Sequence, residues 1–152
     1  MCFLIRKIKM VDKYDDLLRE YALDRGFDYR FFKAIMMAES SGKADVIGDN
    51  GKAFGLFQLH LEACQDVSFC HFDVLLDPHH NIAVASQYIS QVRAWLRGMG
   101  VSATEERIAC VYNLGVGHFQ KLLKKYGDNV MLKVPNWGYI SKVMKFYRQF
   151  LA

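Results

Sequence analysis

Residues 35–58 read IMMAESSGKADVIGDNGKAFGLFQ, and the interpretation of the whole chain starts from this stretch. It opens with an apolar helical run that ends in one acid, Glu39, and continues into a loop rich in glycine and aspartate. The last turn of a helix is an unfavourable place for a carboxylate, because it is the negative end of the helix dipole. Apolar Ile35 and Met36, one turn earlier, would desolvate the acid and raise its pKa. The stretch therefore predicts a functional acid beside a loop.

Helical patterns lie on both sides of this stretch. Apolar residues recur at helical spacing over residues 11–25, and Asp28 is placed to cap the next helix, which carries Glu39 and stops at Gly42. Further along, Asp77 followed by Pro78 predicts the start of a helix that runs to residue 98.

The C-terminal part continues in the same way. Ser102 with Glu105 forms a capping-box pattern, which predicts a helix that ends before Gly115. Helices over residues 118–126 and 137–151 follow. Residues 43–53 contain a cluster of turn formers and predict a structured loop or a short hairpin, whereas residues 55–66 could be helix or strand, with helix favoured.

The composition fits one compact domain. The chain has 152 residues, 52% of them hydrophobic, with only 2 prolines and no repeat or linker-like segment. We therefore expect a single all-α domain over residues 1–152, in which residues 1–10 form a peripheral N-terminal segment. The net charge of +4 would suit an anionic partner, but lysine and arginine are dispersed. The densest group, Lys121, Lys124 and Lys125, is typical of a solvated helix face, so we expect no nucleic-acid partner.

The four cysteines lack the paired spacing of structural zinc sites, and none of the five histidines has a partner at ligand spacing. The sequence therefore predicts no metal and no cofactor. A bridge between Cys64 and Cys70 and a pair of buried free thiols are both compatible with the sequence, because connectivity cannot be deduced from spacing alone.

The first ten residues make a poor secretory signal, because their short apolar run precedes the charges. No stretch approaches the ~20 apolar residues of a membrane span, so we expect none. If the protein acts outside the cytoplasm, it would need another export route.

Three short motifs follow one another along the chain: Glu39-Ser40, GLFQ at residues 55–58, and VYNLG at residues 111–115. Their order and spacing resemble the lytic transglycosylase and goose-type lysozyme superfamily, whose pattern is Glu-Ser, Gly-Leu-Met-Gln and Ala-Tyr-Asn-x-Gly. Weaker similarities at Asn81, Tyr88 and Tyr139 extend the resemblance over about residues 29–147. A glutamate that the family often carries shortly before the late tyrosine is absent here, where residues 135–138 read PNWG.

The resemblance implies a lysozyme-like fold in which the loop or hairpin forms one side of a cleft. It also implies cleavage of the β-1,4 bond between N-acetylmuramic acid and N-acetylglucosamine in peptidoglycan, at the cell wall or in the periplasm. Because the first ten residues make a poor secretory signal, we expect such an enzyme to be phage-encoded or delivered by a secretion system. Glu39 would act first as the acid and then as the base of a transglycosylase reaction that yields 1,6-anhydromuramic products. A raised carboxyl pKa suits this role, because the acid must still be protonated near neutral pH.

Two alternatives remain. A hydrolase, such as a goose-type lysozyme or a chitin-cleaving relative, would need a second carboxylate, for which Asp45 and Asp49 are the candidates. A later acidic position of those lysozymes is His60 in this chain. A non-catalytic wall-binding or structural component is the alternative of another class, against which the presence of Glu39 argues.

The remaining site residues follow from the motifs. We expect a monomer that binds the glycan strand. The contacts with the strand would come from Ser40, Gly55, Leu56, Gln58, Tyr112, Asn113 and Tyr139. Ser40 could instead bond nearby backbone at the helix end, and Asp49 could bond only its own turn. Tyr112 and Asn113 could also form a satisfied pair in the core.

Overall fold

The computed structural model of the chain describes residues 12–67 and 71–152. The peripheral segment predicted for residues 1–10 and one partner of the possible bridge, Cys70, lie outside these ranges. Both expectations therefore stay predictions.

Two helices lead to the predicted acid. A 3-10 turn η1 (Asp12–Tyr14) precedes α2 (Asp15–Asp24), and α3 (Tyr29–Ser40) follows. The Asp28 side chain accepts a hydrogen bond from the Arg30 amide at 2.9 Å and so caps α3, as predicted. The buried Lys33 ammonium lies 2.7 Å from a carboxylate oxygen of Asp12 and of Asp15, which ties α3 to the preceding segment.

The longest helix, α5 (Pro78–Gly98), matches its prediction at both ends. The Asp77 side chain accepts a hydrogen bond from the His80 amide at 2.8 Å, and proline occupies the first turn, where its missing N–H is not needed. The inner face of α5 carries Ile82, Ile89 and Val92, all fully buried.

The C-terminal part contains α6 (Glu105–Leu114), α7 (Val116–Tyr126), a 3-10 turn η4 (Gly127–Leu132) and α8 (Trp137–Leu151). The predicted capping box of Ser102 and Glu105 is wrong. Because α6 begins at Glu105, the residue in the capping position is Thr104, whose hydroxyl accepts a hydrogen bond from the Arg107 amide at 3.3 Å. The Ser102 hydroxyl instead contacts the Arg107 guanidinium.

A small antiparallel sheet forms the other lobe. Strands β1 (Ile47–Gly48) and β2 (Ala53–Phe54) make a hairpin around the 3-10 turn η2 (Asp49–Gly51), and β3 (Leu59–His60) pairs with β2. The hairpin alternative for residues 43–53 is thus confirmed. The ambiguous segment is β3 followed by the short helix α4 (Leu61–Gln65), and the 3-10 turn η3 (Phe72–Leu76) leads into α5.

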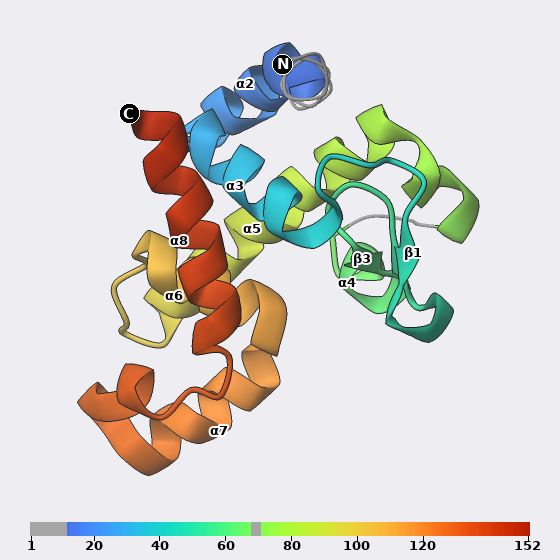
Figure 1. The fold of residues 1–152 in the computed structure, drawn as a ribbon. Helices are drawn as coiled ribbons and strands as arrows, with labels where there is room; N and C mark the ends of the chain where they lie inside the picture. Colours follow the sequence, from blue (N-terminus) through green and yellow to red (C-terminus); the bar gives the residue numbers. More distant parts are fainter. Residues whose placement is uncertain (1–11, 68–70) are drawn as a thin grey trace.

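Helices α3 and α8 lie side by side, with α6 next to α8, while the small sheet and α4 lie beyond the C-terminal end of α3 (Figure 1). The core contains Phe31, Ile35, Val111, Ile140 and other apolar residues of these helices. The all-α prediction is confirmed. Within the described ranges, no helix is both long enough and apolar enough to cross a membrane.

One buried side chain joins the two lobes. Asn81, in the first turn of α5, accepts a hydrogen bond from the Phe57 amide at 2.9 Å and donates to the carbonyls of Phe54 at 2.9 Å and Leu75 at 2.7 Å. Gly55, at φ +74°, packs so closely here that a β-carbon would lie 2.5 Å from the Asn81 amide nitrogen. The loop between β2 and β3 is therefore fixed to α5 by a fully buried amide.

Substitution Asn81→Ala is expected to lower the free energy of unfolding by about 3 kcal/mol, because it leaves one backbone N–H and two carbonyls buried without their partner. Urea denaturation of both proteins measures the difference. The exposed Asn129→Ala is the matched control, and a loss at Asn81 no larger than the control's would contradict this role.

Candidate active site

The carboxyl group of Glu39 lies where the end of α3 meets the start of α8. The Tyr139 hydroxyl, from the first turn of α8, donates a hydrogen bond to Glu39 Oε1 at 2.7 Å. One turn later, the Lys142 ammonium donates to the Ala38 carbonyl at 3.0 Å. Burial raises the pKa of Glu39 from 4.5 to about 7, against the smaller lowering by the Tyr139 hydrogen bond and the Lys142 charge. Near neutral pH, this carboxyl group is therefore available both with and without its proton.

A cleft opens at this carboxyl group. It has a volume of about 490 Å³ and lies between the helical lobe and the sheet. Its lining residues are Glu39, Asp49, Ala53, Gln58, His60, Tyr112 and Asn113. A second hollow of about 410 Å³ shares Gln58, His60, Tyr112 and Asn113 with the first and continues to Val116. Together they form one groove, which we call the main groove.

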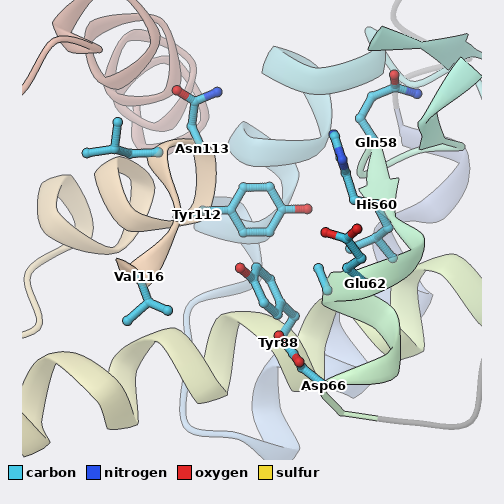
Figure 2. A pocket seen from close by; sticks show the side chains of 12 residues that line it. Gln58, His60, Glu62, Asp66, Tyr88, Tyr112, Asn113 and Val116 are labelled. Carbon is cyan, nitrogen blue, oxygen red and sulfur yellow. The ribbon is translucent and has the colours of Figure 1, made fainter. Parts of the chain in front are cut away.

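Tyr112 and Asn113 come from one side of the second hollow, and Gln58, His60 and Glu62 come from the other (Figure 2). The Tyr112 hydroxyl donates to the Phe57 carbonyl at 2.7 Å, which joins the end of α6 to the loop before β3. Burial raises the pKa of Tyr112 well above 10, so the hydroxyl stays neutral and remains a donor. Tyr112 thus fixes the floor of the groove and also lines it.

Asn113 is exposed in the groove and is oriented by a residue that the sequence did not single out. Asn136 Nδ2 donates to Asn113 Oδ1 and to the Cys110 carbonyl, both at 3.0 Å. Asn136 precedes α8, in the segment where the family's glutamate is absent. It therefore anchors the end of α6 to the start of α8, a contact across more than twenty residues that no local pattern reveals.

The other predicted residues hold the backbone around the groove. Ser40 is buried, and its hydroxyl donates to the Met36 carbonyl and accepts from the Gly42 amide, both at 3.2 Å. Leu56 is fully buried, and the close packing of Gly55 leaves no room for a side chain there. Contact of these residues with substrate stays a prediction, and for Leu56 it would have to be through the backbone.

Gln58 both lines the groove and fastens its wall. Its amide Nε2 donates to the carbonyls of Val46 at 3.0 Å and Gly55 at 2.9 Å. Its backbone has φ +46°, a left-handed conformation that non-glycine residues rarely adopt. Such strain, held in place by two hydrogen bonds of the same side chain, is typical of residues that shape a site.

Asp49 and His60 form a pair on the sheet side of the cleft. His60 Nε2 lies 3.1 Å from Asp49 Oδ2, and 58% of the Asp49 side chain is exposed. His60 is exposed at the position before α4, and it lines the cleft together with Asp49. The Asp49 carboxylate is thus solvated and paired, unlike the buried Glu39.

The arrangement combines one buried acid with a polar groove on its open side. Within the described ranges, no group of three or more histidine, cysteine, aspartate or glutamate residues is placed to hold a metal ion.

Comparisons with known proteins agree with this geometry. The family model described as the transglycosylase SLT domain matches residues 16–133. A comparison with curated proteins finds no match.

Two solved structures share the fold. An inactive mutant of the lytic transglycosylase Slt from Pseudomonas aeruginosa is 23% identical with a TM-score of 0.76, over 92% of this chain and 24% of that one. The 70 kDa soluble lytic transglycosylase from Escherichia coli is 22% identical with a TM-score of 0.76, over 91% of this chain and 24% of that one. The chain thus spans about a quarter of the length of these proteins. Since the family model covers most of its residues, the chain belongs to the family of transglycosylase SLT domains.

Proposed function

We propose that this domain cleaves the β-1,4 bond between N-acetylmuramic acid and N-acetylglucosamine in peptidoglycan as a lytic transglycosylase. The substrate would be the glycan strand of the wall, bound by a monomer at the cell wall or in the periplasm. The observation that carries the proposal is the buried carboxyl group of Glu39, with its pKa raised to about 7, at the end of a groove of sugar-binding dimensions.

The reaction needs only one carboxyl group, which acts twice. Protonated Glu39 gives its proton to the glycosidic oxygen as the bond from that oxygen to muramic acid C1 breaks. The resulting carboxylate takes the proton of the muramic acid C6 hydroxyl, and the C6 oxygen attacks C1 and closes the anhydro ring. Glu39 ends protonated, and no water is consumed. A pKa near 7 suits both steps, because a group that titrates at the working pH gives and takes protons equally well.

The Tyr139 hydroxyl supports both steps. It donates to Glu39 Oε1 and so fixes one oxygen of the carboxyl group, which leaves the other oxygen for the reaction. Its burial raises the pKa of Tyr139 well above 10, so the hydroxyl keeps its proton while Glu39 exchanges one. Tyr139 is therefore proposed as a positioning residue, in addition to the sugar contact that the sequence predicts.

Hydrolysis is the second candidate, favoured by the Asp49–His60 pair in the same cleft. A carboxylate that activates water in an inverting reaction stands about 6.5–9.5 Å from the acid. Asp49 lines the cleft, but its side chain is 58% exposed and lies against His60, whereas Glu39 is buried. A purely structural role for the domain would leave the buried acid, with its raised pKa, without a purpose.

Substitution Glu39→Gln is expected to lower the rate of cell-wall clearing by about 10²–10⁴-fold, because the side-chain amide cannot transfer the proton. It is also expected to stabilise the fold at high pH. The raised pKa of Glu39 contributes stability that is complete below pH 4.5 and is lost as the pH rises through about 7. The neutral glutamine avoids that loss, which amounts to roughly 3 kcal/mol above pH 8.

Turbidity of purified walls and urea denaturation at pH 5 and pH 8.5 measure the two effects. Glu106→Gln, at an exposed acid in the first turn of α6, is the matched control. A clearing rate for Glu39→Gln equal to that of the control would refute the role of Glu39.

Substitution Asp49→Asn is expected to change the clearing rate little and to leave the products unchanged, since the transglycosylase reaction uses no second carboxylate. Mass spectrometry of the digest should find muramic ends that are one water lighter than reducing ends. A digest with reducing ends alone, together with a loss of about 100-fold or more in Asp49→Asn, would establish hydrolysis instead.

A further inference from the structure

Positive charge gathers in the C-terminal part of the helical lobe. Residues 116–137 contain four lysines and one acid, Asp128, a net charge of +3, whereas the whole chain carries +4. All four lysines are exposed, and they are Lys121, Lys124, Lys125 and Lys133. No carboxylate among the described residues forms an ion pair with any of the four. The positive charge of this segment is therefore not neutralised within the described part of the chain.

The turn η4 brings the last of these lysines back to α7. The ammonium group of Lys125, in the last turn of α7, lies 5.2 Å from the centre of the Tyr126 ring. The ammonium group of Lys133, which follows η4, lies 5.7 Å from the same ring. Two like charges from the two ends of η4 thus lie beside one aromatic ring. Because like charges repel, an anionic partner at this place would be favoured.

Two exposed apolar side chains adjoin the lysines. Leu132 is 75% exposed and precedes Lys133, and Trp137 is 40% exposed. The Trp137 indole N–H donates to the Met131 carbonyl at 2.7 Å, which holds the indole ring against η4. A single exposed apolar side chain is ordinary, but two of them beside unpaired lysines make a mixed apolar and basic surface. We call this surface the basic tip, and its residues are Lys121, Lys124, Lys125, Leu132, Lys133 and Trp137.

The basic tip is separate from the site of the reacting bond. Figure 1 shows α7 and the orange turn after it at the end of the helical lobe remote from the C-terminus. Val116, at the start of α7, lines the second hollow of the main groove. No residue of the basic tip lines either hollow of that groove. A partner bound at the basic tip therefore does not need the residues of the groove.

We propose that the basic tip docks on the surface of a membrane that contains anionic phospholipids. The negative potential of such a surface attracts lysines, and each lysine close to it raises the partition coefficient about fivefold. Leu132 and Trp137 would enter the boundary between headgroups and acyl chains, where apolar area leaves water and tryptophan is favoured. The inference concerns binding alone and does not rest on the proposed function.

A soluble polyanion, such as a nucleic acid, is a poorer partner for the basic tip. Its phosphates would neutralise the lysines, but a charged backbone gives Leu132 no apolar surface to enter. Arginine, whose guanidinium binds two phosphate oxygens at once, is absent from residues 116–137. The combination of lysines with exposed apolar side chains therefore favours the lipid surface.

Co-sedimentation with vesicles measures the partition coefficient. Wild type is expected to bind vesicles of phosphatidylglycerol and phosphatidylcholine in equal parts, and to bind vesicles of phosphatidylcholine alone far more weakly. Binding should weaken as the salt concentration rises from about 0.05 to 0.5 M, because salt screens the lysines. The double substitution Lys125→Gln with Lys133→Gln should lower the partition coefficient about 25-fold, and Leu132→Ala should lower it about tenfold.

Exposed residues outside the basic tip give matched controls. The double substitution Lys43→Gln with Lys52→Gln makes the same change in net charge. Leu23→Ala, in α2, removes the same apolar group from a side chain that is 80% exposed. Both controls should keep the wild-type partition coefficient.

The inference is overturned if wild type does not bind the anionic vesicles, or if the variants of the basic tip bind no more weakly than their controls. A loss of binding in the lysine variant alone, with Leu132→Ala at the wild-type value and soluble polyphosphate displacing the protein from the vesicles, would indicate a polyanion site instead. The substituted residues are exposed, and thermal unfolding checks that the variants keep the wild-type fold.

Discussion

The carboxyl group of Glu39 is held between the ends of two helices that lie far apart in the sequence, and the rest of the site depends on this contact. The hydrogen bond from Tyr139 joins residues 100 positions apart. It exists only because α8 packs along α3 and brings its first turn against the last turn of α3. Burial at this junction destabilises the charged form of the acid, and the tyrosine limits that effect, so the carboxyl group titrates near neutral pH.

The opposite wall of the groove depends on a second long-range contact. Asn81 satisfies one backbone group each of β2, the β2–β3 loop and η3. The loop is thereby fixed to the helical lobe, although each strand of its own sheet is only two residues long. Gln58 then fastens the loop to the hairpin from within the cleft. A lobe with so few strand pairs is held by these two side-chain amides, which keep the wall of the groove in place beside Glu39.

Local signals were enough to predict most of the helices, whereas the acid was singled out by three short motifs in order along the chain. Asp77 and Pro78 predicted the start of α5 because capping and a fixed φ are local properties. Glu39 attracted attention because a carboxylate is unfavourable at the C-terminal end of a helix, and the two later motifs made it the candidate acid. The capping residue of α6 was misassigned since two hydroxyl residues, Ser102 and Thr104, compete for one position. The contacts of Tyr139, Asn136 and His60 could not be predicted, because each depends on how distant elements pack.

A direct titration of the Glu39 carboxyl group tests the central claim most closely. Carbon-13 NMR would follow the side-chain carboxyl signal of Glu39 from pH 3 to pH 9. The signal is assigned as the one that is missing from the spectrum of Glu39→Gln. The account predicts a midpoint at about 7 in the wild type and a higher midpoint in Tyr139→Phe, where the hydrogen bond that lowers the pKa is lost. A wild-type midpoint near 4.5, the ordinary value for a solvated glutamate, would contradict the claim that this acid is held protonated by burial.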